Sequence, residues 1–191
     1  MERAWSLRDA GCRILCLDVA HGHHALQKKA IKQIKHELPD VEIIGGNIAT
    51  AQAAIDLVEW GADALRVGIG AGAMCETRIR TGVGVPMITC LQNICEVVPD
   101  TPVIADGGIR KPGDICKAIV AGASTVMLGS ILAGTKESPG QIIPVVKEWP
   151  YEEKYKKYAG SASMEAKLER GEEAENIEGN STLIPYKGKM K

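Results

Sequence analysis

The sequence predicts an α/β fold in which parallel strands alternate with helices. Short apolar runs recur along the chain, helical stretches separate them, and glycine or polar residues follow each run. Because the runs are continuously apolar rather than alternating, we expect strands of a parallel sheet with both faces buried. This pattern is compatible with a (β/α) barrel and with an open doubly wound sheet.

Five strands and four helices are expected. The predicted strands are Ile14–Leu17, Val41–Ile44, Ala64–Val67, Pro102–Ala105 and Thr125–Leu128. The predicted helices are His24–Glu37, Ala51–Trp60, Met87–Val98 and Pro112–Ala121. Thr50 suits an N-cap, and Pro112 suits a first helical position. Gly61 and Gly122 stand where a left-handed residue ends a helix.

The carboxyl ends of the predicted strands carry the residues best suited to ligand binding. In chain order, the strands are followed by Asp18, GGN (residues 45–47), GIG (68–70), DGG (106–108) and Gly129-Ser130. The carboxyl ends of parallel strands meet at one edge of such folds, and substrates bind there. We therefore expect the functional site at this edge.

Composition limits the classes of partner. The chain has 191 residues, 45% of them apolar, with 23 basic and 24 acidic residues. This balance gives no support for a nucleic-acid or membrane-surface partner. Residues 1–10 are charged and lack the apolar stretch of a secretory signal. The uncharged stretch 118–135 is rich in glycine and hydroxyl residues, so we expect helix, turn, strand and turn rather than a membrane span.

The chain is expected to divide after residue 148. Residues 1–148 carry the pattern of strands and helices, whereas residues 149–191 are rich in Glu, Lys and Gly. The latter composition predicts a loop, a lid or a partly disordered segment, with a solvated tail of no function as the alternative.

Six cysteines without a CxxC pair, and without a secretory signal, fit a reduced cytoplasmic compartment. Cys12, Cys16 and Cys116 are expected to be packing residues. Cys75 differs because it lies in the glycine-rich stretch GIGAGAMCET (residues 68–77). A mobile loop at the substrate edge can expose a thiol and favour its ionised form. Cys75 is therefore a candidate nucleophile.

Two glycine turns are candidates for nucleotide binding. Asp106 precedes Gly107 and Gly108, so its carboxylate could accept hydrogen bonds from a ribose diol while the glycines contact phosphate. The alternative is an aspartate that caps the next helix. Gly129-Ser130 adds backbone N–H groups after the last strand, where many barrels bind phosphate.

Asp18 is followed by three histidines within six residues, at His21, His23 and His24. This spacing does not match a structural zinc site, and no acid or thiol lies in register to complete one. We expect no metal there, and a cofactor ribose on Asp18 is the preferred interpretation.

Taken together, these motifs resemble the IMP dehydrogenase and GMP reductase family. The matching stretches are LDVAHG (17–22), GGN (45–47), LRVGIG (65–70), Cys75-x-Thr77, IADGG (104–108), GASTVMLGS (122–130) and ESPG (137–140). The resemblance runs from about Gly11 to Gly188. It implies a TIM-barrel fold of eight strands, of which this chain holds about five, strands four to eight, followed by an active-site flap.

Within the family, three features favour the reductase branch. They are TRIRTGVGVP (residues 77–86), YAGSAS (158–163) and the spacing of EGNSTLIPYKG (178–188). The dehydrogenase flap would carry an Arg-Tyr pair that activates water, and this sequence has no Arg-Tyr dipeptide. The implied activity is GMP reductase: NADPH-dependent reductive deamination of GMP to IMP and ammonia through a covalent Cys–purine intermediate. IMP dehydrogenase, or a truncated or split subunit that binds purine nucleotides without catalysis, is the alternative.

The resemblance also implies roles for individual residues. The catalytic residues would be Cys75, Thr77 and Glu178. The substrate-binding residues would be Asp106, Gly107, Gly108, Gly129, Ser130, Tyr158, Gly160 and Ser161. The residues towards the cofactor would be Asp18, Ala20 and Asn47. Backbone carbonyls of Gly70, Gly72 and Cys75 would bind a monovalent cation, K⁺ in the family.

The resemblance finally implies partners for the chain. Relatives form homotetramers, so a homo-oligomer is expected. A complementing N-terminal fragment that supplies strands one to three is the alternative, because an open five-stranded sheet leaves two unpaired edges.

Overall fold

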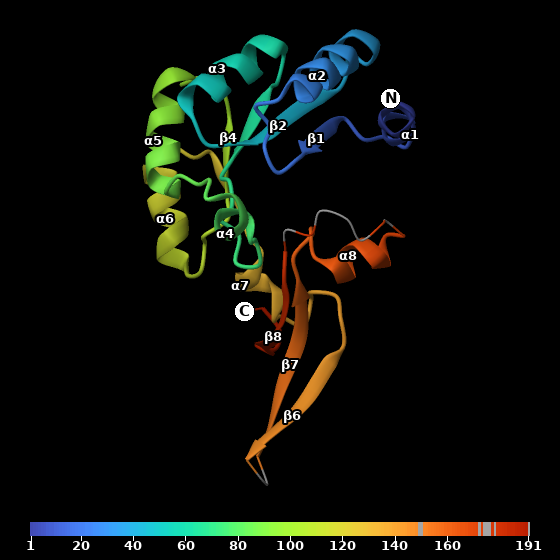
Figure 1. Ribbon diagram of the computed structural model, residues 1–191, viewed down its shortest axis with the longest axis vertical. Helices are drawn as coiled ribbons and strands as arrows, with labels where there is room; N and C mark the ends of the chain where they lie inside the picture. The colour runs from blue at the N-terminus through green and yellow to red at the C-terminus, as the bar shows by residue number, and fades with distance from the viewer. Residues whose placement is uncertain (149–150, 172, 174–176, 178, 191) are drawn as a thin grey trace.

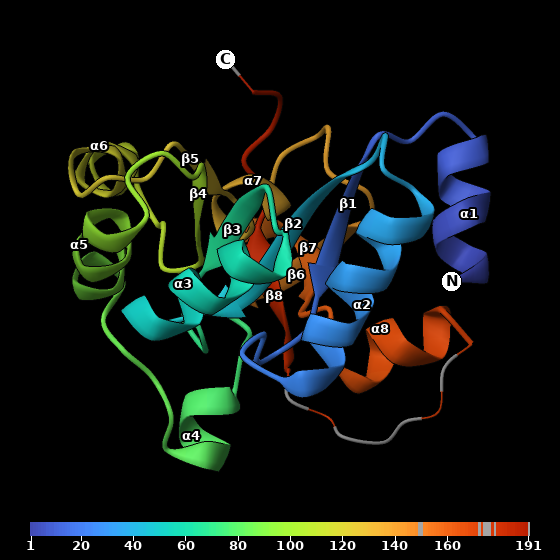
Figure 2. The same cartoon turned by 90° about the horizontal axis from the view of Figure 1, so that it is seen from above.

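The computed structural model describes residues 1–148, 151–171, 173, 177 and 179–190, and it confirms the α/β prediction. Five parallel strands follow one another in the order β1-β2-β3-β4-β5. Their bounds are β1 Ile14–Asp18, β2 Glu42–Ile48, β3 Ala64–Val67, β4 Val103–Asp106 and β5 Thr125–Met127. The curved sheet carries its main helices on one side (Figures 1 and 2). These are α2 Ala25–Glu37, α3 Ala51–Trp60, α5 Met87–Val97 and α6 Pro112–Val120.

This arrangement decides between the two folds that the sequence left open. A doubly wound sheet has helices on both faces and reverses its strand order, whereas these strands run in sequential order with helices outside. The described part is thus a partial TIM barrel. Its core lies between strands and helices, where Ile43, Leu57, Leu65, Leu91 and Ile94 are fully buried.

The opposite face of the sheet is less buried than we predicted. Ile14 is 53% exposed and Met127 is 37% exposed, although both lie in strands. Among the described strands, β1 and β5 each pair with a single neighbour, so this sheet does not close. Cys16, on the same face as Ile14, is exposed, and so is Cys116 on α6, so the expectation that these two thiols are packing residues is wrong.

Capping residues place the helix ends where the sequence predicted them. The Thr50 hydroxyl accepts a hydrogen bond from the N–H of Ala53, and Pro112 occupies the first turn of α6. Gly61 ends α3 with φ 109° and Gly122 follows α6 with φ 111°, a backbone region open to glycine at little cost. Four short helices in the described part of the chain were not predicted: α1 Glu2–Asp9, α4 Thr77–Thr81, α7 Ser130–Ala133 and α8 Met164–Glu169.

The C-terminal part has regular secondary structure where the composition predicted a loop or a partly disordered segment. It forms an antiparallel sheet in the order β6-β7-β8, with a helix before the last strand, below the parallel sheet in Figure 1. The bounds are β6 Ile142–Glu148, β7 Tyr151–Ala159, α8 Met164–Glu169 and β8 Ser181–Pro185. The sheet joins residues on both sides of the expected boundary at 148, and the division into 1–148 and 149–191 stays a prediction.

One buried lysine fastens this sheet to the rest of the chain. Lys156 on β7 is 2% exposed, and its Nζ donates 2.9 Å to the carbonyl of Thr135 and also to the carbonyl of Ser138. A polar sequence can therefore form a packed strand here, because its one buried charge is hydrogen-bonded.

We expect Lys156→Met to lower the free energy of unfolding by about 2 kcal/mol, because two carbonyls lose a charged donor. Urea denaturation measures the change. Lys157→Met is the matched control: its ion pair with Glu165 is 2.8 Å long but its side chain is 55% exposed. We expect that variant to change stability by about 0.5 kcal/mol or less. Equal effects in the two variants would contradict the role of Lys156.

None of the helices in the described part of the chain is both long and apolar enough to cross a bilayer. The uncharged stretch 118–135 holds the end of α6, a turn and β5, as predicted, but the helix α7 follows where a turn was expected.

Candidate functional site

The site is built at the carboxyl ends of the parallel strands, where the sequence predicted it. Asp18 ends β1, Asp106 ends β4, and Asn47 lies near the end of β2. Strand register brings them together, because Asp18 lies opposite Gly46 and Gly46 lies opposite Arg66.

Arg66 on β3 connects two of the predicted carboxylates. Its Nη1 lies 2.7 Å from Oδ1 of Asp18, and its Nε lies 2.8 Å from Oδ2 of Asp106. Gly46 makes the first contact possible: a methyl group there would lie 2.7 Å from Cβ of Arg66. Burial acts to lower the pKa of Arg66. The negative charges of Asp106 and Asp18 raise it by more, so the pKa of Arg66 lies above its ordinary value. Sequence analysis missed this residue, whose only signal was one charge inside an apolar strand.

Asn47 joins the same cluster from β2. Its Nδ2 donates 2.7 Å to Oδ2 of Asp106 and 2.7 Å to the carbonyl of Gly68. Its Oδ1 is buried and, within the described residues, has no hydrogen-bond partner. The structure therefore brings Asn47, which we expected on the cofactor side, against the residue expected to hold the ribose.

The loop after β1 is braced on Asn47. The N–H of Gly22 donates 2.7 Å to the carbonyl of Asn47, and the N–H of Asn47 donates 3.0 Å to the carbonyl of Val19. His23 on this loop lies 2.7 Å from Asp56 of α3, and this hydrogen bond holds the pKa of Asp56 below its usual range. Ala20 is an exposed member of the loop, so the loop that carries two predicted cofactor residues is held at both of its flanks.

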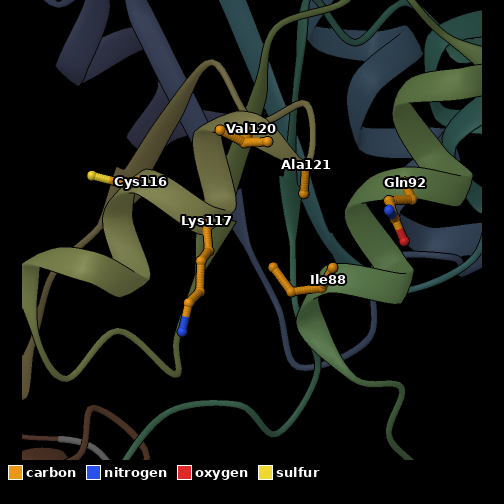
Figure 3. Close-up of a pocket in the computed structure, with 6 residues that line it drawn as sticks. All are labelled: Ile88, Gln92, Cys116, Lys117, Val120 and Ala121. Carbon is orange, nitrogen blue, oxygen red and sulfur yellow. The ribbon is translucent and has the colours of Figure 1, made fainter.

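A cavity of about 490 Å³ opens beside this loop. Its lining includes Cys16, Asp18, His21, His24 and Gln27. A second cavity, of about 400 Å³, lies on the outer helix layer between α5 and α6 (Figure 3). None of the predicted site residues lines that outer cavity, whose walls include Ile88, Gln92, Cys116 and Val120.

Cys75 lies on a turn that is only partly buried. Its Sγ is 3.1 Å from Oγ1 of Thr77, and its N–H donates 3.1 Å to the carbonyl of Gly72. The turn contacts the DGG turn directly, because a methyl group on Gly107 would lie 2.7 Å from both the carbonyl carbon of Ala71 and the nitrogen of Gly72. Gly107 has φ 96°, so side chains are excluded here by conformation as well as by space. The loop that carries Cys75 therefore contacts the Asp106 turn through Ala71 and Gly72.

Tyr158 on β7 reaches the same place from the antiparallel sheet. A methyl group on Gly129 would lie 2.8 Å from the Tyr158 hydroxyl. Burial raises the pKa of Tyr158, and the negative charge of Asp106 raises it further, so the phenol stays a neutral hydrogen-bond donor. Ser130 begins α7 directly after Gly129. The phenol thus lies against the turn at residues 129–130 and within the electrostatic influence of Asp106.

The C-terminal segment closes against the cysteine turn. Gly179 forms isolated β-bridges with Cys75 and with Ser163, and the N–H of Asn180 donates 2.9 Å to the carbonyl of Met74. Gly160, whose N–H donates 2.9 Å to the carbonyl of Asn180, and the adjacent Ser161 lie beside this contact. Glu178, the third predicted catalytic residue, lies outside the described residues.

The predicted cation ligands all lie on the cysteine turn. The carbonyls of Gly70, Gly72 and Cys75 are neutral oxygens, the donor type that suits a hard monovalent cation. The Gly72 carbonyl accepts one hydrogen bond and keeps a second lone pair for a ligand. Within the described residues, no group of three His, Cys, Asp or Glu side chains could hold a metal ion.

The fold and site together define a class: a partial (β/α) barrel in which a loop that carries a cysteine contacts the glycine turn 106–108 at the carboxyl ends of the strands. The IMP dehydrogenase / GMP reductase domain model matches residues 1–191. The chain therefore belongs to this family.

Relatives from both branches are similar to this chain. The inosine-5'-monophosphate dehydrogenases of Escherichia coli (strain K12) and Nitrosopumilus maritimus (strain SCM1) are 46% and 42% identical over 202 residues. A crystal structure of a GMP reductase from Trypanosoma brucei, in complex with guanosine 5'-monophosphate, matches with a TM-score of 0.91 and 40% identity, and the match covers 99% of this chain. The chain spans 40% of the length of the Escherichia coli and Trypanosoma brucei proteins and 41% of the Nitrosopumilus maritimus protein.

Proposed function

We propose that this chain carries the catalytic half of a GMP reductase, which converts GMP to IMP and ammonia with NADPH. The observation that carries the proposal is the contact between the Cys75 turn and the DGG turn at Asp106, made through Gly107. A nucleophile and a nucleotide-binding turn must lie side by side if a thiol is to reach a base while the ribose is held.

The proposed reaction has two steps at Cys75. Its thiolate adds to C2 of the purine, and ammonia leaves with protons supplied through Thr77 and Glu178, which gives a covalent purine–enzyme intermediate. When bound, NADPH supplies the hydride that reduces C2. The carbon–sulfur bond then breaks, the thiolate of Cys75 is restored, and IMP departs. Covalent capture divides one difficult exchange into deamination and reduction.

The other residues bind and orient. Asp106 accepts hydrogen bonds from the ribose hydroxyls, while Gly107, Gly108, Gly129, Ser130, Tyr158, Gly160 and Ser161 surround the phosphate. Asp18, Ala20 and Asn47 face the nicotinamide side, and Asp18 lines the cavity of about 490 Å³. The carbonyls of Gly70, Gly72 and Cys75 would hold K⁺, whose charge would shape the cysteine turn. The segment 149–191 acts as the flap of the catalytic part, residues 1–148.

The chain's own motifs support the reductase over the dehydrogenase. It lacks the Arg-Tyr pair of a dehydrogenase flap, and it carries the GSAS stretch at 160–163. The second candidate is IMP dehydrogenase, which the identities of 42–46% to curated dehydrogenases favour. The third is a nucleotide-binding subunit without catalysis, which the open sheet edges favour.

Two substrate mixtures and one binding measurement separate these candidates. With GMP and NADPH we expect the absorbance of the reduced nicotinamide to fall and IMP to appear by chromatography. Turnover of IMP with NAD, but not of GMP, would make the chain a dehydrogenase. Calorimetric binding of GMP with no turnover in either mixture would leave the non-catalytic subunit.

We also propose that the exposed sheet face and the edges of β1 and β5 are covered in the working protein, by strands from a complementing N-terminal fragment or by copies of this chain in a homo-oligomer. The six free thiols support the proposed cytoplasmic setting. Light scattering on the assay sample tests the assembly, and an active single chain of 191 residues would contradict it.

A further inference from the structure

The residue between Cys75 and Thr77 makes contacts that the proposed chemistry does not use. The carboxylate of Glu76 is 21% exposed, and its two oxygens have different partners. Oε2 lies 2.6 Å from Nη2 of Arg80, one turn along α4. Oε1 accepts a hydrogen bond from the side-chain amide of Asn180 in the C-terminal segment. One carboxylate thus joins two segments that are distant in sequence.

Asn180 is also the backbone link between two parts of the proposed site. Its N–H donates 2.9 Å to the carbonyl of Met74, and its carbonyl accepts 2.9 Å from the N–H of Gly160. Asn180 therefore links the Cys75 turn to the stretch that carries Tyr158 and Gly160, and the two also pack directly, since a methyl group on Gly160 would lie 3.0 Å from Cβ of Met74. Neighbouring packing is tight, since a methyl group on Gly179 would lie 3.0 Å from the nitrogen of Ser163.

We infer that Glu76 is a positioning residue that holds Asn180 and so keeps the Cys75 turn against the stretch 158–161. The inference rests on the proposed function, because that function makes the distance between the thiol and the phosphate-binding stretch matter. Asn180 is exposed, so its two backbone bonds compete with water. A charge-assisted side-chain bond in the same place favours the joined state. Arg80 orients the carboxylate but does not touch Asn180.

The first test compares Glu76→Ala with Glu76→Gln in the full chain. Glu76→Ala removes the acceptor, so we expect kcat to fall about tenfold and hydrogen exchange of the Asn180 amide to become about tenfold faster. Glu76→Gln keeps an acceptor oxygen for Asn180 and is expected to stay within about threefold of wild type in both measurements. Arg80→Met is the matched control, because it removes the ion pair and leaves the Asn180 bond. A purely structural role through Arg80 would make Arg80→Met as harmful as Glu76→Ala and would overturn the inference.

A second variant reverses the sign of the interaction. Asn180→Asp places a carboxylate against that of Glu76, so we expect the exchange defect of Glu76→Ala at pH 7. Exchange of the amide of residue 180 at the wild-type rate in Asn180→Asp, measured at the same pH, would contradict the proposed contact.

Failure of this inference can be told apart from failure of the proposed function. Hydrogen exchange at Asn180 and iodoacetamide alkylation of Cys75, followed by mass spectrometry, need no turnover. If wild type turns over neither GMP nor IMP, but Glu76→Ala still speeds exchange at Asn180, the contact stands and the reductase proposal falls. If wild type is active and Glu76→Ala changes neither exchange nor kcat, Glu76 does not position the turn.

Discussion

Cys75→Ala is expected to abolish turnover of GMP, with kcat reduced by roughly 10³-fold or more, while the Kd for GMP stays within about tenfold of wild type. The thiolate is the group that bonds to the base, so its loss removes the reaction step. The ground-state contacts of the nucleotide lie elsewhere, at the 106–108 and 129–130 turns. The Oγ1 of Thr77, 3.1 Å from the sulfur, remains in place but is not ionised at neutral pH and cannot substitute.

Steady-state kinetics measures kcat, and calorimetry measures the Kd for GMP separately. Cys116→Ala is the matched control, because Cys116 is an exposed thiol on α6 that lies on the outer helix layer. That variant should keep wild-type kcat. Mass spectrometry of the wild-type chain mixed with GMP, without NADPH, should also show an adduct on the peptide that holds Cys75. Wild-type turnover in Cys75→Ala would remove this cysteine from the mechanism.

The parts of the fold that could be predicted from the sequence are those that neighbouring residues determine. The bounds of α3 were predicted correctly because Thr50 caps its start and Gly61, with φ 109°, ends it. The antiparallel sheet was not predicted, because the packing of β7 depends on contacts with residues that are distant in sequence. Lys156 is acceptable in a packed strand only where the carbonyls of Thr135 and Ser138 are in reach, and no local pattern reveals that.

The candidate site likewise has a part that could be predicted from the sequence and a part that could not. Turns at the strand ends could be predicted, because parallel strands must bring their carboxyl ends to one edge. The hydrogen-bond partners of each side chain could not be predicted, because they depend on the register between neighbouring strands. Arg66 reaches Asp18 across β2 only because residue 46, in register between them, is glycine. Asn47 reaches Asp106 past the end of β3, where its amide also donates to the carbonyl of Gly68.

The second large effect is expected for Asp106→Ala, which should raise the KM for GMP about 100-fold. Its Oδ2 accepts from Arg66 at 2.8 Å and from Asn47 at 2.7 Å. Within the described part of the chain, no group donates to Oδ1, which leaves that oxygen for a ribose hydroxyl. Two hydrogen bonds from a ribose diol to a carboxylate, at about 1.5 kcal/mol each, correspond to a factor of about 100 in affinity.

Asp18→Ala is the control that separates loss of a ribose contact from loss of an ion pair with Arg66. Both carboxylates pair with Arg66, so either variant leaves this largely buried cation with one carboxylate partner. Asp18 is 60% exposed and Asp106 is 19% exposed, and only Asp106 adjoins the glycine turn that contacts the cysteine loop. We expect Asp18→Ala to raise the KM for NADPH and to leave the KM for GMP within about threefold. Equal effects of both variants on GMP would show that the pairing of Arg66, rather than a ribose contact, controls nucleotide binding.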